Sequence, residues 1–223
     1  MARRALPTIT TAFTVAAALL LAGCGGGDDA SSGGIEGADT GSGSPSASAS
    51  ATASASAVKR PDVSLPDDLS IVFDFDKPSD EDHAAALADA GNYLRALDHG
   101  ITRQDPTDRA FQFYSSGQAF QYAHGQIKEY VDGGWTLTGK ERYYRAETAT
   151  TAETKAVKLV RVTFCSDQSK VYGKEVKTDK ILYTKDTLAS YQKFSLVMAL
   201  PKGSAVWRAS QITVTGKAAE CRD

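Results

Sequence analysis

Hydrophobic residues recur at helical spacing in the stretch that follows residue 80. From His83 to about His99, apolar residues appear every three or four positions, which predicts a helix with one buried face. Ser79 is the predicted N-cap, the three acidic residues after it suit the positive end of the helix dipole, and Gly100 is the predicted C-terminal stop. The apolar positions of this face are Leu87, Ala90, Leu94, Leu97 and Ile101.

A second helical region is predicted after the breaker Asp105-Pro106. It consists of two parts, Arg109 to Ser116 and Gly117 to Val131, and it ends at the flexible run Asp132-Gly133-Gly134.

Beyond residue 134 the pattern changes to the alternation that is typical of β-strands. We predict a short strand at 135–138, a hairpin of 141–150 with 156–164, and a second hairpin of 191–200 with 205–214. Residues 171–183 are predicted to be mixed and partly exposed, and an extended entry strand precedes the helices at 70–75. Helices followed by antiparallel strands predict an α+β domain whose helices cover one face of a curved sheet.

The first 23 residues have the three parts of an export signal. Arg3 and Arg4 precede an apolar run from Ala12 to Leu21, and small residues follow it. This run is shorter than the roughly 20 residues that a transmembrane helix needs. Residues 1–23 are therefore predicted to be a signal peptide.

The end of this signal, Leu21-Ala22-Gly23-Cys24, resembles the bacterial lipobox. The resemblance implies cleavage before Cys24 and attachment of palmitate-type acyl chains to it, and two or three chains anchor a protein stably. The expected location is the extracytoplasmic face of the cell membrane. The alternative is an ordinary signal peptide that contains a cysteine.

Residues 24–60 are predicted to be a disordered linker. They are mostly Gly, Ser, Ala, Thr and Asp, with little apolar besides Ile35, and such a composition buries too little surface to offset the entropy of ordering it. A flexible coil of this length has an end-to-end distance of roughly 30–40 Å. The remainder, 61–223, is predicted to be a single folded domain.

The charge and the cysteine content of this domain limit the classes of partner and ligand that it is expected to bind. With 25 basic and 27 acidic side chains the formal net charge is −2, which supports neither nucleic-acid binding nor a polybasic membrane contact. Once Cys24 carries lipid, Cys165 and Cys221 remain, and a pair in an exported protein is interpreted first as a disulfide. Two isolated thiols without a CxxC motif make a poor metal site, so no metal or cofactor is expected.

Several short motifs of the folded part resemble the nuclear transport factor 2-like (cystatin-like cone) lipoproteins of actinobacteria. They are Asn92-Tyr93-Leu94, the segment from Tyr114 to Ala119, Gly139, Cys165 with Asp167, and Cys221 after the strand of Trp207. The resemblance implies a cone-shaped fold, often dimeric through its sheet. The chain departs from the usual pattern in its acidic, aromatic entry segment Asp74-Phe75-Asp76 and in a long insert between Asp167 and Tyr191.

The same resemblance implies a concave face on which enzymes of this type place an Asp, His or Tyr as acid or base. The candidates are Asp98, His99, His124, Tyr143 and Tyr144. Asp98 and His99 point about 100° apart on a helix, and the simpler interpretation makes both solvated residues at a helix end and His124 a surface residue. Five aromatic residues are candidate pocket residues, although aromatic side chains of this kind more often belong to a core. They are Tyr93, Tyr114, Phe120, Trp135 and Tyr143.

The sequence contains no nucleophile elbow, HExxH motif, phosphate loop or EF-hand loop. The favoured hypothesis is a non-catalytic envelope domain, with no catalytic residue, that binds a small apolar ligand or a protein partner. The alternative is an envelope enzyme of the isomerase or dehydratase type, which would need a buried ionisable group with a shifted pKa. A third hypothesis is a spacer or surface antigen.

Overall fold

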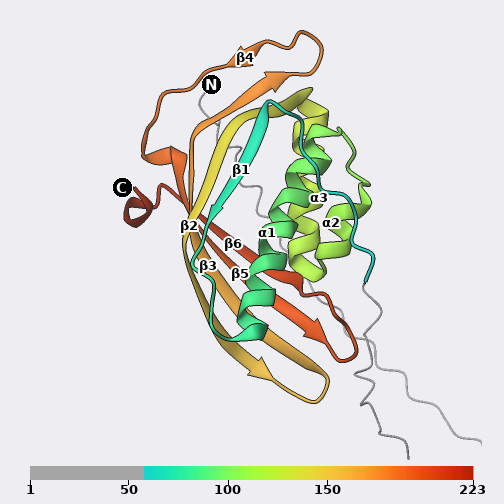
Figure 1. The fold of residues 1–223 in the computed structure, drawn as a ribbon. Helices are drawn as coiled ribbons and strands as arrows, with labels where there is room; N and C mark the ends of the chain where they lie inside the picture. The colour runs from blue at the N-terminus through green and yellow to red at the C-terminus, as the bar shows by residue number, and fades with distance from the viewer. Residues whose placement is uncertain (1–57, 223) are drawn as a thin grey trace, which may run out of the picture. The chain divides into compact units, whose positions relative to one another are not determined.

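The computed structural model describes residues 58–222, which belong to one compact unit. The predicted signal peptide, Cys24 and most of the predicted linker lie outside the described residues. Within this range, three α-helices pack on the concave face of a curved, unclosed six-stranded sheet, so the α+β architecture expected from the sequence is confirmed (Figure 1).

The sheet has the strand order β1-β2-β3-β5-β6, with the short β4 paired to β3 outside this path. β1 pairs in parallel with β2, with Leu69 opposite Gly139, whereas all other pairs are antiparallel. The parallel pairing of the entry strand was not predicted. The strands are β1 (Leu69–Asp74), β2 (Trp135–Glu153), β3 (Val157–Glu175), β4 (Ile181–Leu182), β5 (Tyr191–Pro201) and β6 (Arg208–Gly216).

The first helix, α1, runs from Glu81 to Thr102. Its N-cap is Asp80, whose carboxylate accepts a hydrogen bond from the His83 backbone N–H at 2.9 Å. The prediction of Ser79 as the cap was therefore wrong by one residue. An aspartate serves this position as well as a serine, so residue type alone does not separate the two.

Gly100 lies inside α1 and does not end it, contrary to the prediction. A Cβ at this position would lie 2.6 Å from Cδ1 of Ile127 on α3 (Gly117–Gly133). Glycine at this position lets the Ile127 side chain pack directly against α1, and a larger residue would require that side chain to shift. The helix ends instead at Arg103, whose backbone N–H bonds the carbonyl of His99.

The second predicted helical region is present as two helices, α2 (Arg109–Tyr114) and α3. Asp108 caps α2 by accepting from the Ala110 N–H at 2.7 Å. At the end of α3, Gly134 adopts the left-handed conformation with φ of 70°, which glycine reaches without strain.

The two strands predicted at 135–138 and 141–150 are one 19-residue strand, β2. Gly139 lies inside it with φ of 107°, and a Cβ there would come within 2.0 Å of the Lys170 carbonyl oxygen. Glycine therefore lets the strand continue where the sequence suggested a break. Irregular pairing between β2 and β3 at three places bends the ladder.

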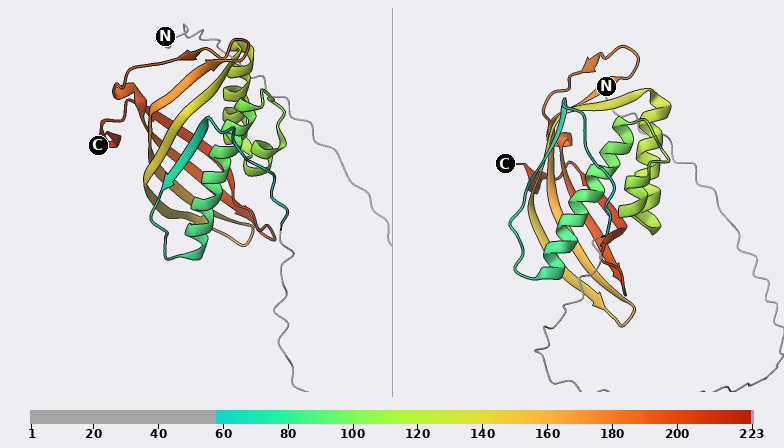
Figure 2. Two further views of the ribbon diagram at one scale, coloured as in Figure 1. Left: turned by 45° about the horizontal axis from the view of Figure 1, so that its top comes forward. Right: turned by 45° about the vertical axis from the view of Figure 1, so that its right-hand side comes forward.

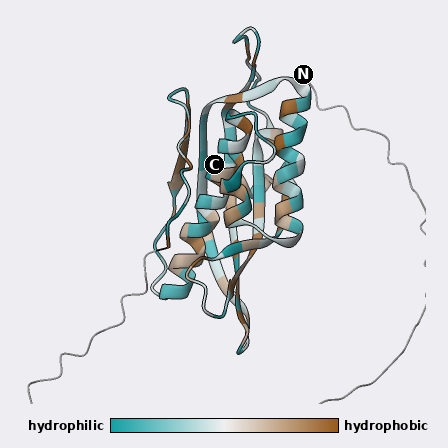
Figure 3. Ribbon diagram, turned by 90° about the vertical axis from the view of Figure 1, so that its right-hand side faces the viewer, coloured by the Kyte–Doolittle hydropathy of each residue, from teal (hydrophilic) through white to brown (hydrophobic). Residues whose placement is uncertain are grey.

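A row of aromatic side chains crosses the concave face of the sheet and forms the centre of the core. Phe73 on β1 stacks on Tyr143 of β2 at 5.3 Å, and Tyr143 meets Phe164 of β3 edge to face at 5.4 Å. Phe164 in turn stacks on Phe194 of β5. The helices cover this face of the sheet (Figure 2), and hydrophobic and hydrophilic residues alternate along them (Figure 3).

The domain begins before the residue that composition suggested. Arg60, assigned to the linker from the sequence, makes a two-pronged ion pair with Asp89 of α1, which is 2% exposed. Asp89 also accepts hydrogen bonds from Asn92 and from the backbone N–H of Trp207. Removing one partner of a buried ion pair leaves an uncompensated charge, so Arg60 is part of the fold.

Candidate functional site

Two buried carboxyl groups lie between α1 and the concave face of the sheet. Asp98 comes from the last third of α1, and Glu141 comes from β2, two residues before the core tyrosine Tyr143. Both carboxyls are buried, with Asp98 6% and Glu141 4% exposed. Since acidic residues are almost never fully buried unless they are paired, this acid pair is the most unusual feature of the interior.

Glu141 is well supplied with hydrogen-bond donors. Its Oε1 accepts from the Ser166 hydroxyl at 2.7 Å and from the Gln168 amide at 2.8 Å, both on β3, and the Tyr143 hydroxyl donates to the same carboxylate. Burial nevertheless raises the pKa of Glu141, while these three donors oppose that rise. Glu141 is thus the better placed of the two acids to carry a negative charge.

Asp98 has the opposite environment. Its Oδ2 is buried and has no hydrogen-bond partner within residues 58–222. Burial, reinforced by the neighbouring Glu141 carboxyl, raises the pKa of Asp98 well above its usual range. Burial therefore favours the protonated form of Asp98, beside a hydrogen-bonded Glu141. In acid–base sites, two neighbouring acids often lie in different environments, which separate their pKa values.

The acid pair is closed off from solvent. Tyr143 beside it is also buried, and burial raises its pKa well above the ordinary value. Neither acid lines either of two surface hollows of residues 58–222, one at the C-terminal end of α1 and one beside Trp207. The acid pair therefore lies in the packed interior, away from both of these hollows.

The larger of these hollows is an open groove at the C-terminal end of α1, with a volume of about 500 Å³. His99 is buried at its edge, with Nδ1 3.1 Å from Oδ2 of Asp108, outside ordinary hydrogen-bond geometry. The prediction that Asp98 and His99 are solvated was wrong for both. The groove is lined by Asp62, His99, Arg103, Asp105, Thr107, Asp108 and Arg109.

Two acidic side chains of the groove are hydrogen-bonded within the protein, whereas a basic side chain, that of Arg109, is not. Asp105 accepts from the hydroxyl and backbone N–H of Thr107 at 2.7 and 2.8 Å, and these bonds lower its pKa. Asp62 is held in the same way by Ser64. The exposed guanidinium of Arg109 has no hydrogen bond or ion pair to any described residue. The groove thus presents both signs of charge, with a cation free to bind a partner.

The five aromatic residues proposed as pocket residues are buried or half-buried in the structure. Tyr93, Tyr114 and Tyr143 are buried core residues, and Phe120 and Trp135 are half-buried. The Tyr93 hydroxyl donates to the Ala119 carbonyl at 2.9 Å, which satisfies it inside the core. None of the five lines either hollow of residues 58–222.

The two remaining candidates lie away from the acid pair. His124 on α3 is half-buried and stacks on Phe120 at 6.2 Å. Tyr144 is buried on the other face of β2, in a small cluster with Cys165, Tyr191 and Cys221. The structure therefore brings together only Asp98 and Tyr143 from the list of acid–base candidates.

Glu141 was missed in the sequence, although the pattern contained it. It lies two residues before Tyr143 on an alternating strand, so both share a face. Asp98 lies four residues after Leu94 and three before Ile101, which places it on the buried stripe of the helix. The signal for both acids is periodicity, because each is a polar residue on an otherwise apolar face of its element.

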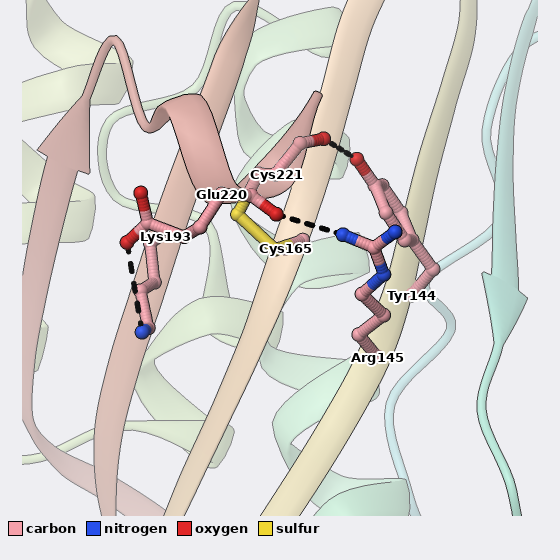
Figure 4. Close-up of a disulfide and its surroundings, with 6 residues drawn as sticks. All are labelled: Tyr144, Arg145, Cys165, Lys193, Glu220 and Cys221. Atoms are coloured by element: carbon pink, nitrogen blue, oxygen red, sulfur yellow. Dashed lines mark hydrogen bonds and ion pairs between the residues drawn. A yellow bond between two sulfur atoms is a disulfide. The ribbon is translucent and has the colours of Figure 1, made fainter. Parts of the chain in front are cut away.

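A disulfide joins Cys165 on β3 to Cys221 in the last turn of the described chain, with Cα atoms 5.3 Å apart. The C-terminal segment is held on the sheet by further contacts (Figure 4). Tyr144 donates its hydroxyl to the Cys221 carbonyl, and Arg145 donates to the Glu220 carbonyl at 2.7 Å. The C-terminus is thus fixed to the face of the sheet opposite the helices.

No family model matches the chain, and no curated protein matches it significantly. Among solved structures it is similar to the intermembrane-space region of the chloroplast protein ARC6, with 9% identity over 61% of this chain and 98% of that one and a TM-score of 0.39. No helix of residues 58–222 is long and apolar enough to span a bilayer.

Proposed function

We propose that the chain is an exported lipoprotein, held at the extracytoplasmic face of the cell membrane by lipid on Cys24, whose domain binds a partner without catalysing a reaction. The observation that carries the location is the Cys165–Cys221 disulfide. Disulfides persist in oxidising compartments and are rare in the cytosol. The lipobox-like segment that ends at Cys24 supports the same location from the sequence.

The anchor is tested by metabolic labelling with an alkyne fatty acid in cells that express the full chain. We expect the wild-type protein to take up label and to partition into the detergent phase. Cys24→Ala is expected to lose both properties, because no other thiol is available in the signal region. Cys165→Ser with Cys221→Ser is the matched control and should keep its label. An unlabelled wild-type protein would contradict the proposal.

The binding role is supported by the contrast between the interior and the surface. The acid pair is closed, whereas the groove of about 500 Å³ is open and lined by charged and polar groups. Such a lining suits a polar polypeptide surface better than a small apolar ligand, which favours pockets lined mainly by hydrophobic side chains. An envelope protein is accordingly the proposed partner.

This role is tested by a photo-crosslinking amino acid at Thr107, an exposed residue of the groove, in the full-length protein in cells. We expect a discrete adduct with an envelope protein. The same amino acid at Gln211, exposed on β6, is the control and should give none. Arg109→Glu should reduce the adduct severalfold. Identical adducts from both positions, or none from Thr107, would remove the groove from consideration.

An envelope enzyme of the isomerase or dehydratase type is the second candidate, and the acid pair favours it. The protonated Asp98 would act as general acid and the hydrogen-bonded Glu141 as base. This requires an opening to the interior. Deuterium incorporation from solvent next to the carbonyl group of small ketones, present in the wild type and lost in Asp98→Asn, would favour the enzyme over the binding role.

A further inference from the structure

The long insert between Asp167 and Tyr191 forms a projecting hairpin, here called the β3–β4 arm and defined as residues 170–185. In Figures 1 and 2 it extends from the end of the sheet opposite the β2–β3 and β5–β6 turns. β3 continues to Glu175, and β4 folds back on it, with Leu182 opposite Gly173. The sequence predicted only a mixed, partly exposed stretch here.

The arm is held firmly at its base. The Val176 N–H donates to the Gly134 carbonyl at the end of α3 at 3.0 Å, and Lys174 forms an ion pair with Asp68 at 2.6 Å. The turn is closed by Glu175, whose N–H donates to the Lys180 carbonyl at 3.0 Å. The backbone of the arm is therefore held in place by the sheet and by the end of α3.

The charge of the arm differs from that of the rest of the chain. It contains five lysines and two acids, a net charge of +3, so the remainder of the chain carries −5 of the total of −2. Lys170, Lys177, Lys180 and Lys185 are exposed. Within residues 58–222 none of the ammonium groups of these four lysines has a hydrogen bond or ion pair, in contrast to that of Lys174.

The arm also exposes apolar surface. Only four large hydrophobic residues are exposed in the described part of the chain, and two belong to the arm: Tyr183 at 74% and Val176 at 42%. Tyr183 leans edge-on against Tyr172 at 4.9 Å, which presents an aromatic pair beside the lysines. Aromatic rings flanked by lysines are enriched where proteins meet the headgroup region of a membrane.

We propose that the β3–β4 arm is a membrane-contact element that binds anionic phospholipid headgroups. The lysines would bind the phosphates, while Tyr183 and Val176 would enter the interfacial layer. Each lysine near an anionic leaflet adds to the attraction, which fades within a Debye length of about 8 Å at physiological salt. The inference rests on the proposed lipid anchor in one respect only, which is that the anchor would hold the domain near a membrane.

The test uses residues 58–223, which contain the complete core and the disulfide, in sedimentation with phosphatidylcholine vesicles of increasing phosphatidylglycerol content. The bound fraction should rise with phosphatidylglycerol and fall at high salt. Lys177→Glu with Lys180→Glu should weaken binding at least about tenfold, and Tyr183→Ser severalfold. Lys155→Glu with Lys202→Glu, exposed lysines in turns at the other end of the sheet, is the matched control and should bind as the wild type.

The outcomes separate this inference from the proposed anchor, because the tested domain lacks Cys24. Absence of binding to phosphatidylglycerol vesicles would overturn the membrane contact and leave the labelling experiment unaffected. An equal loss in the control variant would show that charge alone acts, and would also overturn it. Binding to an isolated anionic cell-wall polymer without binding to vesicles would assign the arm to that polymer instead.

Discussion

Asp98→Asn is expected to make the domain more stable near and above neutral pH, by about 1–3 kcal/mol, because the amide is neutral at every pH and can form the hydrogen bond that Asp98 lacks. Burial raises the pKa of Asp98 well above that of the unfolded chain. Between these two pKa values the folded state holds a proton that the unfolded state has released, so stability falls as pH rises. Asparagine removes this dependence, and its amide can donate to Glu141.

Urea unfolding of wild type and variant at pH 5, 7 and 9 measures the effect. The difference should grow from pH 5 to pH 9. Asp105→Asn is the matched control with the opposite sign, because donation from Thr107 lowers the pKa of Asp105. Asp105 thus contributes stability above its unfolded pKa that is lost as pH falls. If Asp98→Asn were less stable than the wild type at every pH, Asp98 would have to be ionised in the folded protein, with its charge stabilised by neighbouring groups.

Loss of the Cys165–Cys221 disulfide is expected to lower the free energy of unfolding by about 4 kcal/mol. The bond closes a loop with a sequence separation of 56 residues, and a cross-link of this length removes a corresponding entropy from the unfolded chain. Domain stabilities are typically about 5–15 kcal/mol, so this loss is a large share of the total. The double change Cys165→Ser with Cys221→Ser avoids leaving a free buried thiol.

The control for the disulfide is Lys193→Ala. Lys193 forms an ion pair with Glu220 in the same C-terminal segment, at 3.6 Å between two exposed side chains, and such surface pairs contribute about 0–1 kcal/mol. Urea midpoints of the double serine variant, the reduced wild type and Lys193→Ala make the comparison. Equal midpoints for all three would mean that the other contacts of Tyr144 and Arg145 hold the segment by themselves.

The elements that could be predicted are those whose signal is local. The face of α1, the division between α2 and α3, and the β5–β6 hairpin all follow from spacing and from breaker residues. Gly100 and Gly139 misled the prediction for one shared reason. Each was interpreted as a break in its own segment, whereas its role is set by contact with a distant residue, Ile127 or Lys170. Such long-range contacts are not encoded in local patterns.

Only one of the two acids of the candidate site was predicted, because the pair is formed by residues that are far apart in the sequence. Asp98 was singled out, but a solvated helix end is the ordinary place for an aspartate. Only the approach of β2 shows that Glu141 faces it from the sheet. The charge balance misled in a similar way, since a total of −2 conceals the +3 of the β3–β4 arm.

The parallel pairing of β1 with β2 has a consequence for the order of folding. Leu69 pairs with Gly139, 70 positions later, and the sheet is complete only when β6 has been added near the end of the chain. Contacts this far apart in sequence make folding slow, because the loop must be closed before they form. The entry strand β1 therefore waits without a partner until all three helices and the first part of β2 have been synthesised.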